Sequence, residues 1–421
     1  MARYEGSVKI LHLYDGHEKV YDGQGSLPRI IWNIARRTAD RDHDVTVIER
    51  QWDGLPAVGE HEGVRFRRLN LRTGSDTPWE QVPYEMVSNA RGLATLVLDR
   101  TNFARKTLRW LRYGEYDAVH VYLPFAANVL VTLSPGLCRK MVYTAQLGEL
   151  RLNSLTATDG ESDVDAPGFL DFFSPDIYIA RRVACTTVLN PTVREIFADN
   201  GVDRDRLVHI PNGVNVEKFE SITDDDCTRV RDAYDLGDRP VVFFAGTIMP
   251  RKGVAEFVEA AADVVAAGHD DVKFVIAGET DLDDEYMETV QSLIAEGGID
   301  ANVTFTGYLN DSELLPMYQT ASVFVLPSFE EGFGMVVSEA MAAGTPPVAS
   351  RISGIDQQID DGNTGIMVEP GSVDELGAAL TELLDDPEKR RTMGEQSRER
   401  AQQFSWERIT DQYIDVYEKL G

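Results

Sequence analysis

The stretch Pro327–Gly344, PSFEEGFGMVVSEAMAAG, decides how this chain is interpreted. It predicts the end of a buried strand, a loop with two acids and a Gly-Phe-Gly turn, and then a helix of small and apolar residues. Glu331 lies in the predicted loop, and Glu339 falls about two turns into the helix. The segment therefore combines a helix start with two carboxylates.

The start of this helix is expected to bind an anion. Its free amides would point at a ligand phosphate, and the helix dipole favours negative charge there. These amides belong to Phe333, Gly334, Met335 and Val336. Gly332 and Gly334 would let the backbone approach closely. The two carboxylates suit sugar and ribose hydroxyls, so the segment predicts a nucleotide-sugar pocket. The alternative is an ordinary strand-to-helix turn with solvated acids.

Length and composition bound the class of protein. The 421 residues, 43% of them apolar, are enough for two or three domains with full cores. No run approaches the roughly 20 apolar residues of a membrane span, and the N-terminus does not resemble a signal peptide. The three cysteines, Cys138, Cys185 and Cys227, lack the spacing of a metal or redox motif, which favours a reduced, cytoplasmic location.

The net charge of −29 is unevenly placed. Residues 1–210 hold 26 Lys and Arg against 28 Asp and Glu, whereas residues 211–421 hold 15 against 42. Such an acidic surface suggests a halophilic source, because high salt screens its repulsion. It argues against nucleic acid as a partner, since neither half has a basic excess.

Both halves alternate short apolar runs with segments of helical period. The first half predicts a helix at Leu27–Arg37 and strands at Val8–Tyr14, Val45–Glu49, Ala118–Tyr122, Met141–Ala145 and Ala184–Leu189. The second half predicts strands at Val241–Ala245, Lys273–Ala277, Val303–Thr306, Val323–Leu326 and Pro347–Ala349. This alternation is typical of parallel sheets covered by helices, whose ligands bind beyond the carboxyl ends of the strands. The expected fold class is α/β, with two Rossmann-like domains facing a cleft.

A hinge is expected at Val208–Val216, which contains HIPNGVNV, because Pro and Gly break the pattern there. It divides the chain into an N-terminal, acceptor-side domain at 1–212 and a C-terminal, ligand-binding domain at 213–403. The last segment, 404–421, is an amphipathic helix expected to pack back on the first domain.

Two glycine-bearing loops follow predicted strands. In Asp22–Gly25, Gly23 and Gly25 would let the backbone meet a pyrophosphate, although a tight turn explains them equally well. In the second loop, GTIMPRKG, Lys252 could offset the charge on a departing diphosphate. A solvated loop lysine is the alternative.

Two further features lie in the first half. His120 ends a predicted strand and is assigned either to the acceptor side or to a packed, hydrogen-bonded interior. A predicted helix carries a basic, amphipathic stretch at 100–112, with Arg100, Arg105, Lys106, Arg109 and Arg112. It is expected either to rest on anionic lipid or to be an ordinary solvated face.

Taken together, these motifs resemble the retaining glycosyltransferases of the GT-B fold, in the large group-1 family (family 4). The similarity covers nearly the whole chain, from the Gly-x-Gly loop through the PNGV hinge and the RKG segment to PSFEEGFGMVVSEAMAAG. The resemblance implies that Lys252 contacts the donor diphosphate, Glu331 the donor sugar and Glu339 the ribose. It also implies that the amides of residues 333–336 hold phosphate and sugar hydroxyls, and that neither metal nor cofactor is needed.

The chain departs from the family pattern at two places. Thr247 stands where an Arg is common, so one positive charge on the diphosphate is missing, and Arg251 is expected to compensate in part. Gln146 stands where many members carry a His close to the transferring sugar. It can hydrogen-bond a hydroxyl but cannot carry charge.

The sequence thus predicts a cytoplasmic, retaining glycosyltransferase that moves a sugar from a nucleotide-sugar donor to a glycan or lipid-linked acceptor. Lys252, Glu331 and Gln146 are its expected catalytic residues, and a contact with the inner face of the membrane through 100–112 is a further expectation. Two alternatives stay open: a non-catalytic nucleotide-sugar-binding subunit, and an epimerase or phosphorylase on the same fold.

Overall fold

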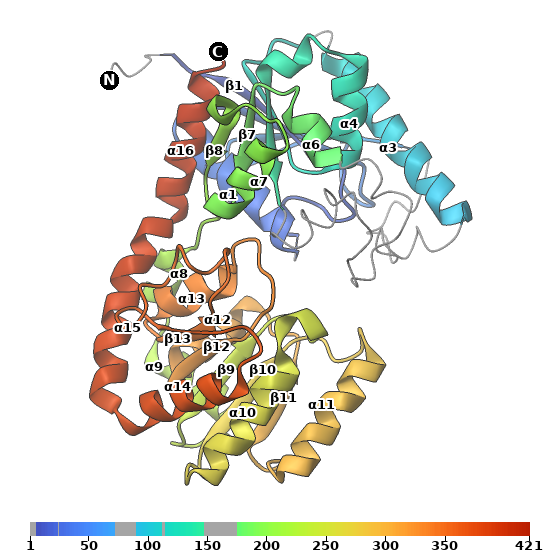
Figure 1. Cartoon of the computed structure of the whole chain (residues 1–421). Helices are drawn as coiled ribbons and strands as arrows, with labels where there is room; N and C mark the ends of the chain where they lie inside the picture. The colour runs from blue at the N-terminus through green and yellow to red at the C-terminus, as the bar shows by residue number, and fades with distance from the viewer. Residues whose placement is uncertain (1–5, 24, 72–89, 112–113, 147–174) are drawn as a thin grey trace. The chain divides into compact units, whose positions relative to one another are not determined.

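The computed structural model describes residues 6–23, 25–71, 90–111, 114–146 and 175–421 (Figure 1). The chain divides into two compact units. The N-terminal unit consists of Met1–Asn212 and Trp406–Gly421, and the C-terminal unit is Gly213–Ser405. Each unit contains its own, mainly parallel sheet with helices around it, so the expected fold class is confirmed.

Eight strands form the sheet of the N-terminal unit in its described residues, in the order β3-β4-β2-β1-β5-β6-β7-β8. They are β1 (Lys9–Leu13), β2 (Asp44–Arg50), β3 (Val58–His61), β4 (Val64–Leu69), β5 (Ala118–Val121), β6 (Met141–Ala145), β7 (Cys185–Val188) and β8 (Leu207–His209). All neighbours are parallel except β3 and β4, which form an antiparallel hairpin at one edge. The central strands are buried along their length, whereas β3 has no buried residue.

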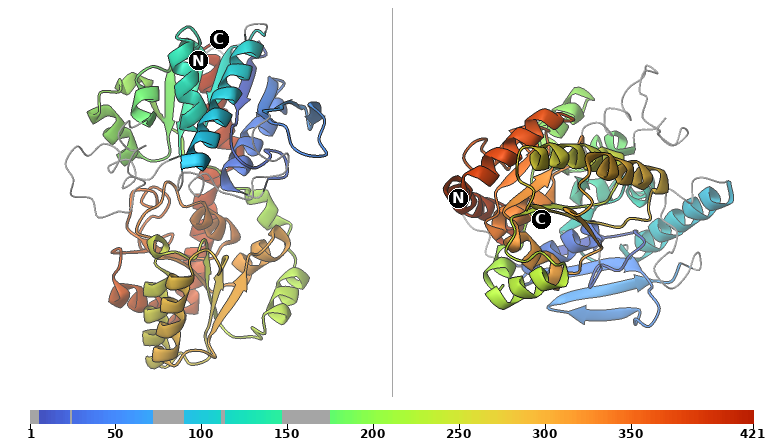
Figure 2. Two further views of the ribbon diagram at one scale, coloured as in Figure 1. Left: turned by 90° about the vertical axis from the view of Figure 1, so that its right-hand side faces the viewer. Right: turned by 90° about the horizontal axis from the view of Figure 1, so that it is seen from below.

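Helices cover both faces of this sheet. They are α1 (Ser26–Ala39), α3 (Ala90–Leu111), α4 (Pro124–Leu133), α6 (Pro175–Ala180), α7 (Pro191–Asp199) and α16 (Trp406–Glu418), with short 3-10 turns at Leu137–Lys140 and Arg204–Arg206. On one face α4 packs between α3 and α6, and Figure 2 shows α3 and α4 side by side. On the other face α16 packs against α1. The C-terminal helix therefore does contact the first domain, as expected.

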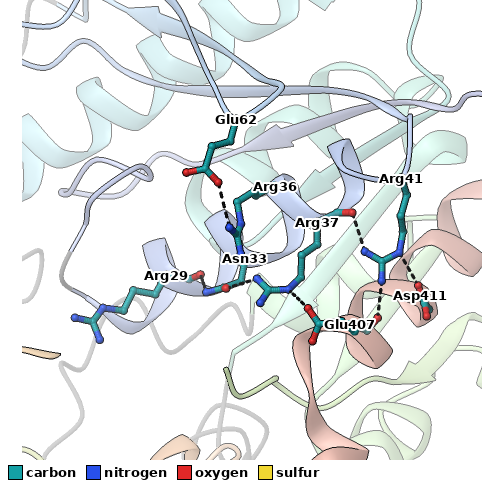
Figure 3. Close-up of polar contacts among 8 residues, drawn as sticks. All are labelled: Arg29, Asn33, Arg36, Arg37, Arg41, Glu62, Glu407 and Asp411. Atoms are coloured by element: carbon teal, nitrogen blue, oxygen red, sulfur yellow. Dashed lines mark hydrogen bonds and ion pairs between the residues drawn. The ribbon is translucent and has the colours of Figure 1, made fainter. Parts of the chain in front are cut away.

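The contact between α1 and α16 includes ion pairs. Figure 3 shows Arg37 of α1, and Arg41 two residues after the end of α1, reaching Glu407 and Asp411 of α16. Trp406, Tyr413 and Tyr417 of α16 are almost completely buried, and the two tyrosine rings lie beside His120. Helix α16 begins two residues later than expected, because Gln402–Phe404 forms a separate 3-10 turn.

Six parallel strands form the sheet of the C-terminal unit, in the order β11-β10-β9-β12-β13-β14. They are β9 (Val241–Ala245), β10 (Lys273–Ala277), β11 (Val303–Gly307), β12 (Val323–Leu326), β13 (Pro347–Ser350) and β14 (Ile366–Val368). Parallel strands that are buried on both faces read as largely apolar runs, as in β9, β10, β12 and β13. Together with the half-buried β11, these are the strands that the sequence predicts, and β14 was not predicted.

The helices of the C-terminal unit form two groups. One group is α10 (Val254–Ala266), which packs against α11 (Asp284–Gly297) and α14 (Val373–Asp385). The other is α12 (Asp311–Thr320), which packs against α8 (Val216–Glu220), α9 (Asp224–Ala233) and α13 (Met335–Ala343), while α15 (Pro387–Ala401) packs on α13. Within the described ranges, every helix of the chain falls short of the length and apolar character that a bilayer crossing requires.

Helix α12 contains a proline in its interior. Pro316 has no amide hydrogen, so the carbonyl of Ser312 loses its helical partner. Arg229 of α9 supplies a donor instead, with its Nη2 atom 3.1 Å from that carbonyl oxygen. This bond joins the two helices and helps to fix α12 in place.

Candidate functional site

Two loops meet at the carboxyl end of the C-terminal sheet. The first follows β9 and leads through the 3-10 turn Pro250–Lys252 into α10, and the second follows β12 and leads into α13. Because β9 and β12 are neighbours in the sheet, their loops lie side by side. A backbone hydrogen bond joins them, in which the amide of Phe329 donates to the carbonyl of Arg251 over 2.8 Å. The two segments that carry the predicted donor-site residues are therefore in contact.

Gly253 allows this close approach. Its φ of 69° lies in the left-handed region, and a Cβ atom there would come within 2.1 Å of the carbonyl oxygen of Pro327. No other residue type fits such a position without moving one of the loops. Gly253 thus determines how closely the turn that bears Lys252 can lie to the second loop.

Lys252 and Glu331 form an ion pair between the loops. Their side chains are only 11% and 10% exposed, so the pair is shielded from water. Ser328 also donates to the Glu331 carboxylate, from Oγ to Oε1 over 3.0 Å. The structure therefore brings together a cation and a carboxylate that lie far apart in the sequence, as the motifs predict.

The turn before α13 needs a glycine and a buried glutamine. Gly334 has a φ of 78°, and a Cβ atom there would lie 2.5 Å from Cδ1 of Ile355. Gln358, which has no exposed area, donates from Nε2 to the carbonyl oxygen of Phe333 and accepts from Ser338. These contacts hold the start of α13, where Gly334 has no side chain to cap the helix. Gln358 has no sequence signal, because it lies 14 residues after the end of the motif in an irregular segment.

Glu339 also has a partner that the sequence does not reveal. The phenol of Tyr318, on α12, donates to Oε2 of Glu339 over 2.9 Å. Tyr318 has no exposed area, and Glu339 is half-buried. Burial and the adjacent carboxylate raise the pKa of Tyr318 well above its usual value. The phenol therefore stays protonated and remains a hydrogen-bond donor.

A pocket of about 300 Å³ lies at this end of the sheet. Two predicted donor-site residues, Thr247 and Val336, line it, as does Tyr318. Glu279, which follows β10, and Tyr308, which follows β11, extend the wall, and Leu314 lies on it one helical turn before Tyr318. The side chain of Arg251 is exposed and is not among the lining residues. The sequence analysis assigned no role to Glu279 or Tyr308, which directly follow the glycines at the ends of β10 and β11.

The glycine loop of the N-terminal unit is closely packed. The amide of Gly25, at the N-cap of α1, donates to the Glu18 carboxylate over 2.7 Å. A Cβ atom at Gly23 would lie 2.2 Å from the carbonyl oxygen of Lys19. Both glycines thus serve a closely packed turn, and a carboxylate already occupies the Gly25 amide. This arrangement favours the tight-turn alternative over a pyrophosphate contact.

His120 lies in a fully buried polar cluster. Its Nδ1 atom is 2.7 Å from the Tyr417 hydroxyl on α16, and its Nε2 atom is 2.6 Å from Oγ1 of Thr144. His12 lies beside it and contacts Tyr122. Burial lowers the pKa of His12 to about 3, and burial together with His12 lowers the pKa of His120 well below its usual value. With no exposed area, His120 fits the packed alternative and not a contact with an acceptor.

Gln146 follows β6 at the limit of the described residues. Its side chain is half-buried, and its Nε2 atom has no hydrogen-bond partner within the ranges that the structure describes. The structure therefore leaves its expected catalytic role as a prediction.

The basic helix is α3, but its cationic face is smaller than expected. Arg100 is buried, with its Nη1 atom 3.0 Å from Asp99 and its Nε atom 3.4 Å from Asp15. It therefore belongs to the interior of the N-terminal unit and cannot meet a surface. Arg105 and Arg109 are exposed, while Arg112 lies outside the described residues.

No group of three or more His, Cys, Asp or Glu side chains that could hold a metal ion occurs in the part of the chain that the structure describes.

Two family models match the sequence. Residues 27–218 match the model described as Glycosyltransferase Family 4, and residues 228–400 match the one described as Glycosyl transferases group 1. The second match contains both loops of the candidate site and the whole motif that begins at Pro327.

Some individual proteins match this chain over most of its length, and others over about half of it. The D-inositol 3-phosphate glycosyltransferase of Pseudarthrobacter chlorophenolicus is 34% identical over 397 residues, which cover 93% of this chain and 90% of that one. The alpha-D-kanosaminyltransferase of Streptomyces kanamyceticus is 36% identical over 193 residues, 46% of this chain and 49% of its own length. Among solved structures, sucrose-phosphate synthase of Thermosynechococcus elongatus has a TM-score of 0.78 at 23% identity and covers 98% of this chain and 99% of its own.

Proposed function

Because this chain belongs to the group-1 glycosyltransferases of family 4, a retaining family with the GT-B fold, we propose how its C-terminal unit binds the nucleotide-sugar donor and promotes transfer. Lys252, Glu331 and the start of α13 receive the diphosphate and the sugar, and the adjacent pocket receives the nucleoside. The acceptor is a glycan or a lipid-linked sugar. We further propose that no metal takes part.

The observation that carries this proposal is the shielded pair of Lys252 and Glu331. Breaking the bond between sugar and diphosphate leaves negative charge on the phosphate oxygens. A lysine and the amides at a helix N-terminus stabilise such charge most when they are fixed in advance and shielded from water. When the donor binds, Lys252 exchanges its contact with Glu331 for the diphosphate. Glu331 then accepts hydrogen bonds from the sugar hydroxyls.

The pocket supports the nucleoside part of the proposal. Its wall is largely apolar, with Leu314 and Val336, but it also includes the Glu279 carboxylate and two phenols. Flat bases suit such a wall, and Glu339 lies one helical turn beyond Val336 on α13. Base, ribose and diphosphate would thus follow one another from the pocket to Lys252.

Retention is explained in this family by attack on the same face of the sugar. The acceptor oxygen bonds to the anomeric carbon as the bond to the diphosphate breaks, and the leaving phosphate oxygen takes the acceptor proton. No separate carboxylate base is required. The role of Lys252 and the α13 amides is then to stabilise the diphosphate as it leaves, with Thr247 in place of the more common, charged Arg. Gln146 would hydrogen-bond a hydroxyl of the transferring sugar.

The donor can be identified by a thermal-shift screen against UDP-, GDP-, ADP- and dTDP-sugars. A donor at 100 times its Kd stabilises the folded protein by about 2.7 kcal/mol, which raises the melting temperature measurably. Transfer to sugar acceptors, with D-inositol 3-phosphate included because a relative is named for it, then tests the enzyme. Binding without transfer or donor hydrolysis would favour the non-catalytic subunit, whereas a product formed without acceptor would favour an epimerase. A product formed only with inorganic phosphate would favour a phosphorylase.

We also propose that an anionic membrane surface presents the lipid-linked acceptor to α3. Val97 and Leu98 are 50% and 62% exposed, and Leu98 shares one face of α3 with Arg105 and Arg109, which lie seven and eleven residues later. Exposed apolar groups followed by cations suit a layer of anionic head groups. Arg105→Glu should weaken co-sedimentation with phosphatidylglycerol vesicles, but Arg139→Glu, at an exposed site outside α3, should not. Equal binding by both variants would contradict this contact.

A further inference from the structure

We infer that Tyr318 is a positioning residue for the ribose of the donor, acting through Glu339. Its phenol fixes one carboxylate oxygen of Glu339, so that the carboxylate is held ready to accept hydrogen bonds from the ribose hydroxyls. The inference rests on the proposed function, because it requires that Glu339 bind a nucleotide. It extends that function to a residue of another helix, outside the motif around Pro327.

The geometry that supports the inference is a rigid phenol beside a carboxylate. Tyr318 has no exposed area, and its ring packs against those of Phe243, Phe324 and Phe219, with centroids 5.2, 5.4 and 6.1 Å away. Its backbone carbonyl oxygen accepts from the Thr345 hydroxyl. Since both the ring and the backbone of Tyr318 are held, its hydroxyl has little freedom. The 2.9 Å hydrogen bond from the Tyr318 hydroxyl to Oε2 therefore restricts the Glu339 carboxylate more than it restricts Tyr318.

The position of Tyr318 also connects it with the nucleoside. Its side chain lines the pocket of about 300 Å³, together with Thr247 and Val336. A carboxylate that swings freely loses side-chain entropy when it binds a hydroxyl. One that is already fixed by a buried donor loses less, so the hydrogen bond contributes more to affinity. The expected consequence is selectivity for ribonucleotides over deoxyribonucleotides.

Tyr318→Phe removes the hydroxyl and keeps the ring in its aromatic surroundings. Because Glu339 is half-buried, water can reach the carboxylate, and the variant is expected to fold. The matched control is Tyr234→Phe, which removes another phenol that contacts a carboxylate, Glu313, over 3.3 Å. Tyr234 lies at the end of α9 and does not line the pocket.

The test measures the Kd of whichever of UDP, GDP and ADP binds, and of its 2′-deoxy and 3′-deoxy forms, by calorimetry. A hydrogen bond to a charged group corresponds to a loss of roughly tenfold in affinity. Tyr318→Phe should show this loss of affinity for the ribonucleotide. For the deoxy form that lacks the hydroxyl bound by Glu339, the loss of affinity should be much smaller. In turnover, KM for the donor should rise while kcat changes little. Tyr234→Phe should match the wild type throughout.

A background variant separates positioning from packing. If Tyr318 acts through Glu339, adding Tyr318→Phe to the Glu339→Ala variant should cause little further loss of nucleotide affinity. If Tyr318→Phe instead damages the packing, the losses of affinity of the two substitutions should add in full. Equal losses for ribonucleotide and both deoxynucleotides, or no loss at all, would overturn the inference while leaving the proposed function intact. A wild-type protein that binds dTDP but none of UDP, GDP and ADP would overturn the inference alone. One that binds none of these four nucleotides would overturn both the inference and the proposed function.

Discussion

Arg37 on α1 and Glu407 on α16 form an ion pair that closes the N-terminal unit, with Nε and Oε1 2.6 Å apart (Figure 3). The two sides of the pair differ, since the Arg37 side chain is 5% exposed and that of Glu407 is 42% exposed. Arg37 also donates to Oδ1 of Asn33, over 2.7 Å. The chain leaves the N-terminal unit at Asn212 and returns to it with α16, so this contact fixes the returning segment.

The asymmetry predicts that losing the carboxylate costs more than losing the cation. Glu407→Gln removes the negative charge that pairs with the buried Arg37 guanidinium. It should lower the free energy of unfolding by about 1–3 kcal/mol. Arg37→Met leaves a carboxylate that water can reach and should cost less. Arg36→Met breaks a pair with Glu62 in which both side chains are at least 33% exposed, and it serves as the control, at about 0–1 kcal/mol. Urea unfolding measures all three, and a larger cost for Arg37→Met than for Glu407→Gln would contradict this account.

Stability should fall in acid because of the two buried histidines. The pKa of His12 is lowered to about 3 in the folded chain by burial, and that of His120 is lowered as well. Once unfolded, both would titrate near 6.5. Above that pH the two histidines are neutral in both the folded and the unfolded chain, so they do not make stability depend on pH. As pH falls below it the unfolded chain gains protons that the folded chain excludes, so stability decreases down to about pH 3 for His12.

Substituting His120 isolates this effect from the many carboxylates. His120→Gln keeps hydrogen-bonding groups in the cluster but does not titrate. The difference in melting temperature between the variant and the wild type should therefore shift in favour of the variant as the pH falls from 7.5 to 5. A difference that stays constant over that range would show that His120 is not held neutral.

A Cβ atom at Gly334 should disturb the turn before α13, because the buried Ile355 side chain would have to move. Gly298 offers a matched control, since it too has a positive φ, 63°, but a Cβ atom there would meet nothing within 4 Å. Gly298→Ala should cost about 1 kcal/mol from backbone strain alone. Gly334→Ala also collides with Ile355, so it should cost more and weaken donor binding. Melting curves measure the stability of the two variants, and calorimetry measures their affinity for the donor. Equal stability and equal donor affinity of the two variants would contradict the assigned geometry.

The parallel strands could be predicted because burial on both faces leaves a continuous apolar signal. Val241–Ala245, Lys273–Ala277 and Val323–Leu326 are found with the expected bounds. The hairpin β3–β4 could not be predicted, because β3 lies at an edge of the sheet, has no buried residue and shows no apolar run. Local pattern thus reveals the continuously buried strands most clearly, although the half-buried edge strand β11 was also predicted.

The two loops of the candidate site could be located from the sequence because each carries its own motif. The pairing of Lys252 with Glu331 follows from loops on adjacent strands. The burial of His120 depends on Tyr417, 297 residues later, and the contact of Gly25 with Glu18 depends on how the loop folds. No local spacing contains either fact. The halophilic source expected from the net charge also stays a prediction, and the relatives that match give it no support.

The central claim is that Lys252 and Glu331 act on one donor, and the rate of sugar transfer by the two single variants tests it most directly. With the donor and acceptor identified as above, Lys252→Ala and Glu331→Ala should each lower kcat by about 10²–10³, while melting curves show a folded protein. Lys218→Ala, which breaks an exposed pair with Asp311, should transfer sugar at the wild-type rate. Undiminished transfer by both site variants would contradict the account.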